Sequence, residues 1–125
     1  AAHYYGKEIT VVGAEPKGAD DAYKSFYSKS FIPSVNPTTI ADGLLTSLGS
    51  ITFPIILDYV HQMTTVSESS ITEAMKLIWE RMKIIVEPSS AVPLAAILEG
   101  KVDIRQKRVG IILSGGNVDL TALPF

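Results

Sequence analysis

Ile111-Ile112-Leu113-Ser114-Gly115-Gly116-Asn117-Val118-Asp119-Leu120 is the stretch of sequence that decides the fold. The apolar run at residues 109–113 is typical of a buried strand, and it ends abruptly at a hydroxyl, two glycines and an amide. In open α/β sheets, ligands bind just beyond the carboxyl ends of strands, where glycines let the backbone approach a ligand at little steric cost. The stretch therefore predicts either a ligand-binding strand end or an ordinary polar turn, and these residues alone do not decide between the two.

Strands and helices are predicted to alternate along the rest of the chain. Apolar spacing and breaker residues predict strands over residues 9–12 and 63–66, in addition to 109–113, and helices over 22–27, 52–61, 71–87 and 90–100. The expected N-terminal caps are Asp20 or Asp21, Thr52, the capping box Ser70–Glu73, and Ser90, with Gly100 as a C-terminal stop. This alternation predicts an α/β fold with three layers, in which a mainly parallel sheet is flanked by helices.

The composition excludes several classes of protein. A chain of 125 residues with 46% hydrophobic residues is long enough for one modest globular domain. A net charge of −2 argues against binding to nucleic acid or to an anionic membrane surface, and no apolar run approaches the roughly 20 residues of a membrane helix. The absence of cysteine excludes disulfides and thiolate-bound metals. We expect a cytoplasmic protein with no nucleic-acid or membrane partner.

Four ordered motifs resemble one enzyme family. They are Ala14-Glu15-Pro16 with Ala19-Asp20-Asp21, Thr39-Ile40-Ala41-Asp42-Gly43, Trp79-Glu80-Arg81-Met82-Lys83 with Val86-Glu87-Pro88-Ser89, and Leu113-Ser114-Gly115-Gly116-Asn117. Together they resemble the serine racemase and serine/threonine dehydratase family, whose members use pyridoxal 5′-phosphate on a tryptophan-synthase-β-like (fold type II) scaffold. The resemblance implies that residues 1–125 are the C-terminal part of the large cofactor-binding domain. The small domain and the N-terminal part of such an enzyme are expected to lie outside this sequence.

The resemblance also implies which residues line the cofactor. Ser114 takes the place that faces the pyridine nitrogen, and a neutral hydroxyl there cannot hold that nitrogen protonated as an aspartate would. Glu87 lies beside the ring, Gly43 lines the cofactor with its backbone, and Gly115 lets the chain come close. The alternatives are a serine that satisfies its own turn and a surface carboxylate at a helix end.

A cation site and a nucleotide site are implied in the same way. Glu15, the main-chain carbonyl of Ala19 and Asp21 match a divalent-cation site, and these oxygen ligands suit Mg²⁺ or Ca²⁺, with Mn²⁺ as a further candidate. The alternative is that the two aspartates cap a helix and that Glu15 is solvated. Lys83 and Asn117 match positions that contact an ATP effector in animal members, although Lys83 is otherwise an ordinary solvated charge.

We therefore expect the parent protein to be a homodimeric enzyme that acts on L-serine or a related hydroxy amino acid. With L-serine it would give D-serine by racemisation, pyruvate and ammonia by dehydration, or both. No lysine of this sequence lies in the family's Ser-x-Lys-x-Arg-Gly context, and no glycine run matches its phosphate loop. The 125 residues alone are thus expected to be inactive, with no catalytic residue of their own. The alternative is a non-catalytic α/β domain that binds a cation, a nucleotide or a protein partner.

Overall fold

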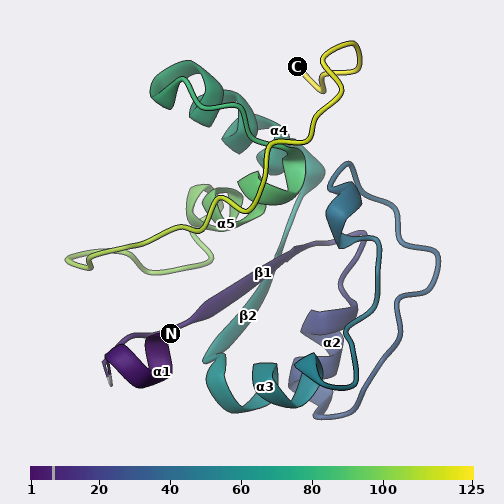
Figure 1. The fold of residues 1–125 in the computed structure, drawn as a ribbon, viewed down its shortest axis with the longest axis vertical. Helices are drawn as coiled ribbons and strands as arrows, with labels where there is room; N and C mark the ends of the chain where they lie inside the picture. The colour runs from purple at the N-terminus through teal and green to yellow at the C-terminus, as the bar shows by residue number, and fades with distance from the viewer. Residues whose placement is uncertain (7) are drawn as a thin grey trace.

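A parallel pair of strands lies at the centre of the computed structural model, which describes residues 1–6 and 8–125 (Figure 1). Strand β1 (Val12–Pro16) pairs with β2 (Gln62–Val66) in a register that runs from Val12 opposite Gln62 to Pro16 opposite Val66. Parallel neighbours need a long crossover connection. Residues 17–61 make that crossover, and they carry α2 (Asp21–Ser28), the short 3-10 helix η1 (Asp42–Leu44) and α3 (Thr52–Tyr59).

The remaining helices pack together after β2. Helix α4 (Glu68–Leu77) continues into the π-helical turn η2 (Ile78–Met82), and α5 (Pro88–Leu98) follows after a short connection. A short helix α1 (Ala2–Tyr5) begins the chain, and residues 99–125 contain no helix or strand. Within the described residues, no helix is both long and apolar enough to cross a membrane.

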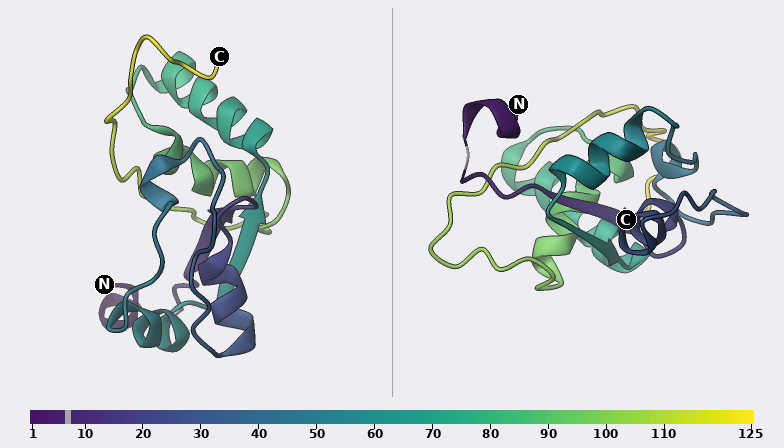
Figure 2. Two further views of the ribbon diagram at one scale, coloured as in Figure 1. Left: turned by 90° about the vertical axis from the view of Figure 1, so that its right-hand side faces the viewer. Right: turned by 90° about the horizontal axis from the view of Figure 1, so that it is seen from below.

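Two apolar cores lie on opposite faces of the sheet. Side chains alternate between the faces of a strand, so Met63 packs with Phe26 and Ala22 of α2, whereas Val66 joins the core formed with α4 and α5. In that larger core, Ile71, Met75, Val92 and Ala95 are almost completely buried. Figure 2 shows the strands between α2 and α3 on one side and α4 and α5 on the other. The prediction of an α/β fold with a parallel sheet between helical layers is therefore confirmed.

Two strand predictions need correction. The first strand begins at Val12 rather than residue 9, and Ile9 is exposed. Residues 109–113 form no strand, and Ile112 is 81% exposed. The physical reason is that, within the part of the chain that the structure describes, this segment has no hydrogen-bonded strand neighbour. Val109 and Ile111 instead line a groove of about 770 Å³ together with Val12 and Ala14 of β1.

Several helix boundaries also differ from prediction. Helix α3 has Ile51 as its N-cap, so Thr52 is the first helical residue rather than the cap, and the helix ends at Tyr59 rather than residue 61. Helix α4 is capped by Ser67, which accepts a hydrogen bond from the backbone N–H of Ser70 at 3.3 Å, so Ser70–Glu73 is not the cap. The helical segment ends at Met82, because Lys83 adopts a left-handed conformation (φ 59°). Helix α5 begins with Pro88 after Glu87 as its N-cap, so Ser90 lies inside the first turn. Gly100, with φ 66°, ends α5 as predicted.

Candidate functional site

The start of α5 carries a half-buried carboxylate that is anchored to a distant segment. Glu87 Oε2 accepts a hydrogen bond from the backbone N–H of Asn117 at 2.9 Å, and the Glu87 N–H donates to the carbonyl oxygen of Gly115 at 3.1 Å. Pro88 favours this arrangement, since it fixes the first helical residue and pushes Glu87 into an extended conformation. Residues 115–117 therefore run along the N-terminal end of α5.

Ser114 and Gly115 lie against the first turn of the same helix. The buried hydroxyl of Ser90 is 2.7 Å from both the nitrogen and the carbonyl oxygen of Gly115, and it lies 3.3 Å from the Ser114 hydroxyl. The Ser114 side chain itself is exposed. Its hydroxyl thus lies beside the α5 turn and is accessible to a ligand.

Two glycines keep this site open. A methyl group on Gly115 would lie 3.0 Å from Glu87 Oε1, and one on Gly43 would lie 2.9 Å from the Ser89 hydroxyl and 3.9 Å from Glu87 Oε1. The Gly43 N–H also donates to Ser89 Oγ at 3.1 Å, which links η1 to the start of α5. Glu87 therefore lies between Gly43 and Gly115, and the structure brings together all four residues predicted to line a cofactor.

The predicted cation residues lie around the turn from β1 to α2: Glu15 near the end of β1, Ala19 in the connecting loop and Asp21 at the start of α2. Glu15 Oε2 accepts a hydrogen bond from the backbone N–H of Tyr23 at 2.7 Å. Burial raises the pKa of the Glu15 carboxyl from 4.5 to about 7; the Tyr23 hydrogen bond opposes this change, and the negative charge of nearby Asp21 adds to it. Glu15 is therefore not the freely solvated side chain of the alternative interpretation.

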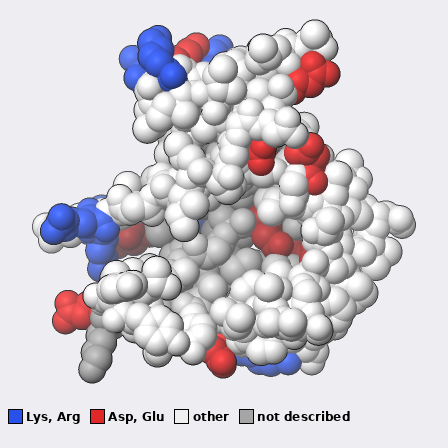
Figure 3. Space-filling view, viewed as in Figure 1, with Lys and Arg blue, Asp and Glu red and all other residues white. Residues whose placement is uncertain are grey.

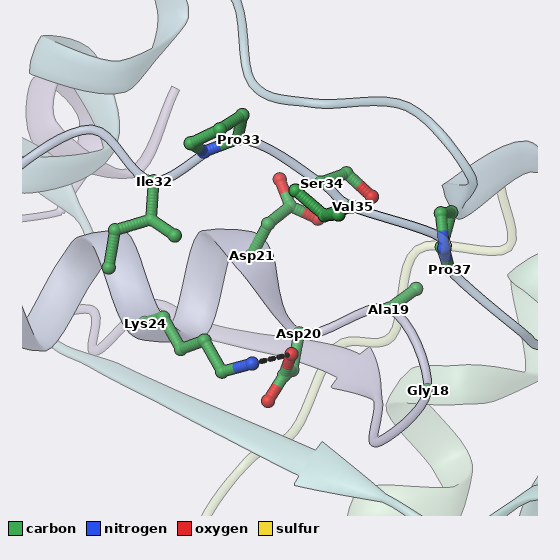
Figure 4. Close-up of a pocket in the computed structure, with 10 residues that line it drawn as sticks. All are labelled: Gly18, Ala19, Asp20, Asp21, Lys24, Ile32, Pro33, Ser34, Val35 and Pro37. Atoms are coloured by element: carbon green, nitrogen blue, oxygen red, sulfur yellow. Dashed lines mark ion pairs between the residues drawn. The ribbon is translucent and has the colours of Figure 1, made fainter.

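Asp21 has the most unusual environment in this cluster. Only 5% of its surface is exposed, and both carboxylate oxygens are buried without a hydrogen-bond partner among the described residues. In Figure 4 it points toward Ser34 and Val35, whereas Asp20 turns away to pair with Lys24 at 2.8 Å. Both aspartates and Ala19 line a cavity of about 180 Å³.

Burying a carboxylate without a partner is costly, so a bound cation would compensate its charge. The described residues contain no group of three or more His, Cys, Asp or Glu side chains placed to hold a metal ion. The predicted cation site does not require three such side chains, since it combines the carboxylates of Glu15 and Asp21 with the main-chain carbonyl of Ala19. The buried, unpaired oxygens of Asp21 fit such a site.

The two residues predicted to contact a nucleotide both lie on the exposed surface. Lys83 is exposed at the C-terminal end of η2, and Asn117 is exposed beside Glu87. Their segments run near each other, because a methyl group on Gly116 would lie 2.6 Å from the carbonyl oxygen of Ile85. On the face drawn in Figure 3, basic side chains gather at the edges, and acidic side chains lie nearer the middle.

Sequence reasoning missed the roles of Ser89 and Ser90. It assigned Ser90 as a helix cap, yet the two hydroxyls connect α5 to Gly43 and to Gly115. The only sequence signal for these contacts was the pair of adjacent serines that follows Glu87 and Pro88. Their partners are distant in sequence and could not be identified from local spacing.

Comparisons with known proteins place this geometry in context. Residues 1–115 match the family described as pyridoxal-phosphate dependent enzyme. The serine racemase of Dictyostelium discoideum is 56% identical over 122 residues, which cover 92% of this chain and 37% of that protein. The beta-hydroxyaspartate dehydratase of Paracoccus denitrificans is 48% identical over 118 residues, covering 94% of this chain and 38% of the relative.

A solved structure agrees with these matches. Maize serine racemase superimposes with a TM-score of 0.89 at 42% identity, covering 97% of this chain and 38% of that protein. The chain thus spans little more than a third of the length of the proteins it matches. On the family match, these identities and the shared fold, the chain belongs to the pyridoxal-phosphate dependent enzymes of fold type II.

Proposed function

We propose that residues 1–125 are the C-terminal part of the large cofactor-binding domain of an enzyme that acts on L-serine or a related hydroxy amino acid. Its reactions would be racemisation of L-serine to D-serine, dehydration to pyruvate and ammonia, or both. The names of the two relatives, a serine racemase and a beta-hydroxyaspartate dehydratase, support this substrate class. Because the chain spans 37–38% of those relatives, the activity belongs to the whole protein.

One observation carries the proposal: Ser114, Gly115, Glu87 and Gly43 converge at the start of α5. The exposed Ser114 hydroxyl can donate to a ring nitrogen, and the two glycines leave space that any larger side chain would fill. These residues fit pyridoxal 5′-phosphate, which when bound supplies the electron-withdrawing chemistry that protein side chains lack.

Each residue of the chain then has a defined task. Ser114 orients the ring without forcing its nitrogen to stay protonated, because a hydroxyl carries no negative charge. Glu87 is fixed by the Asn117 N–H, so its carboxylate tunes the surroundings rather than moving a proton. Gly43 and Gly115 provide close backbone approach.

The test is a direct assay of the full polypeptide with L-serine. D-serine or pyruvate should form only when pyridoxal 5′-phosphate is present. Failure of the purified protein to bind pyridoxal 5′-phosphate would contradict the proposal and favour the alternative of a non-catalytic α/β domain.

We also propose that Glu15, the Ala19 carbonyl and Asp21 hold Mg²⁺, Ca²⁺ or Mn²⁺. The buried, unpaired carboxylate of Asp21 supports this site, and oxygen ligands suit these hard cations. A cation would tie the loop after β1 to the start of α2, and so stabilise this part of the fold rather than take part in the reaction. Isothermal titration with Ca²⁺ and Mg²⁺ tests it directly.

Two further assignments come from the resemblance to serine racemases. Lys83 and Asn117 are proposed to contact an ATP effector, and the complete enzyme is proposed to be a cytoplasmic homodimer. The exposed positions of both side chains are compatible with ligand contact. Light scattering of the full polypeptide, and its activity with and without ATP, test these assignments.

A further inference from the structure

Ser90 is the most buried side chain of the candidate cofactor site, with 1% of its surface exposed. Its hydroxyl oxygen accepts a hydrogen bond from the Gly115 N–H at 2.7 Å. It also donates to the Gly115 carbonyl oxygen at 2.7 Å. A single side chain therefore satisfies both backbone groups of a residue that has no side chain of its own.

The number of hydrogen bonds that the Ser90 hydroxyl can make decides how it interacts with Ser114. Ser90 has one proton and two lone pairs. Its proton goes to the Gly115 carbonyl, which is closer than the Ser114 oxygen at 3.3 Å, and one lone pair accepts the Gly115 N–H. The second lone pair of Ser90 can accept the Ser114 proton only while no ligand is bound, because Ser114 needs its single proton to donate to a ring nitrogen. Ser90 thus fixes the Gly115 backbone beside Ser114, and with it the position from which the Ser114 hydroxyl can reach a ligand.

We propose that Ser90 is a positioning residue for cofactor binding, which acts through the Ser114 hydroxyl by fixing the Gly115 backbone next to it. The inference rests on the proposed function, because it requires Ser114 to face pyridoxal 5′-phosphate. Without Ser90, Gly115 keeps the hydrogen bond from the Glu87 N–H to its carbonyl at 3.1 Å, and Asn117 stays bonded to Glu87, but among the described residues the Gly115 N–H loses its partner. Without Ser90, the Ser114 hydroxyl is held less firmly, so its hydrogen bond to the cofactor carries an ordering cost that weakens binding.

The first arm of the test needs no cofactor. In the cofactor-free full polypeptide, Ser90→Ala should speed amide hydrogen exchange at Gly115 by about 2- to 12-fold, the value of one neutral hydrogen bond. Ser89→Ala is the matched control. It removes a hydroxyl from the same turn, but that hydroxyl bonds Gly43, so exchange at Gly115 should stay unchanged. Unchanged exchange at Gly115 in Ser90→Ala would overturn the proposal.

The second arm is a double-mutant cycle on affinity for pyridoxal 5′-phosphate. Ser90→Ala alone should weaken binding by about 2- to 12-fold. In a Ser114→Ala background the same change should have little further effect, because the positioned hydroxyl is already gone. Equal losses in both backgrounds would mean a merely structural role and would overturn the proposal. Ser90→Cys, which keeps the shape but weakens the hydrogen bonds, should give a smaller loss and covers the case in which Ser90→Ala fails to fold.

Failure of this inference is distinguishable from failure of the proposed function. If the unaltered protein binds no pyridoxal 5′-phosphate, both are overturned. If it binds the cofactor and Ser114→Ala weakens binding, but Ser90→Ala does not, then the proposed function stands and only the Ser90 assignment is overturned.

Discussion

The carboxylate of Glu99 joins the end of α5 to the start of α4, and its neutralisation should destabilise the fold. Glu99 Oε1 accepts hydrogen bonds from the Ser67 N–H at 2.7 Å and from the Ser67 hydroxyl at 2.8 Å. The backbone hydrogen bond from Ser67 is the main reason why the pKa of Glu99 falls from 4.5 to about 2. Ser67 is the cap of α4, so one carboxylate supports the contact between the two helices.

The size of the effect follows from that pKa. At 1.36 kcal/mol per pH unit, a pKa lowered from 4.5 to about 2 corresponds to about 3 kcal/mol of stability in the charged form. A folded-state pKa below the unfolded value contributes stability that is complete above about pH 4.5. It is lost as pH falls toward 2, with about half left at pH 3. Glu99→Gln should therefore cost about 2–3 kcal/mol at pH 7 and about half of that at pH 3.

Urea unfolding of the full polypeptide, followed by circular dichroism at pH 7 and pH 3, measures this difference. Glu80→Gln is the matched control, because Glu80 is an exposed glutamate whose nearest ion pair, to Lys76, spans 3.9 Å. That change should alter stability by less than about 1 kcal/mol. If Glu99→Gln cost no more than Glu80→Gln at pH 7, or the same amount at both pH values, the proposed role of Glu99 would be wrong.

Three further predictions concern the proposed sites. Asp21→Asn should lower Ca²⁺ affinity by about 10-fold or more in isothermal titration, since it removes a charged ligand. Glu73→Gln, at an exposed position, should leave the affinity unchanged, and equal Ca²⁺ affinities of Asp21→Asn and the unaltered protein would refute the cation site. Gly115→Ala should weaken binding of pyridoxal 5′-phosphate, because the new methyl group would displace the Glu87 carboxylate 3.0 Å away. Gly110→Ala, which meets no described atom within 4 Å, should bind the cofactor normally. The 125-residue chain alone should release no pyruvate from L-serine, because it has no lysine in the family's Ser-x-Lys context, and steady release by pure protein would contradict this.

Local sequence signals predicted the parts of the fold that depend on local chemistry. The strand at 63–66, the helices after Asp20 and near Thr52, and the stop at Gly100 all follow from apolar spacing and from breaker residues. The cap of α4 was misplaced because Ser67, Ser69 and Ser70 are all possible caps. Glu99, which bonds Ser67, comes from 32 residues further along the chain.

The errors at 109–113 and at Ser90 have a common cause. An apolar run becomes a strand only when a neighbour is available for pairing, and within the described part of the chain residues 109–113 have no hydrogen-bonded strand neighbour. Ser90 looked like a cap because a serine near a helix start usually is one. Its actual partners lie 24 and 25 residues away, and only the folded chain brings them together.

The resemblance placed Ser114, Gly115, Glu87 and Gly43 in one site, and the structure places them side by side at the start of α5. Their role in holding a cofactor is still a prediction. Asp21 was chosen as a cation ligand from its motif, and its burial without a partner was not visible in the sequence. Burial of this kind depends on the loop at residues 32–37, which no local pattern connects to Asp21.

The affinity of Ser114→Ala for pyridoxal 5′-phosphate is the most direct test of the central claim. Titration of the cofactor-free full polypeptide should show binding weakened by about 2- to 12-fold, the value of one hydrogen bond, and by more if the ring nitrogen is left buried without a partner. Ser30→Ala, which alters an exposed serine beyond α2, should bind as the unaltered protein does. Identical affinities for Ser114→Ala and the unaltered protein would contradict the assignment of this segment to a pyridoxal-phosphate site.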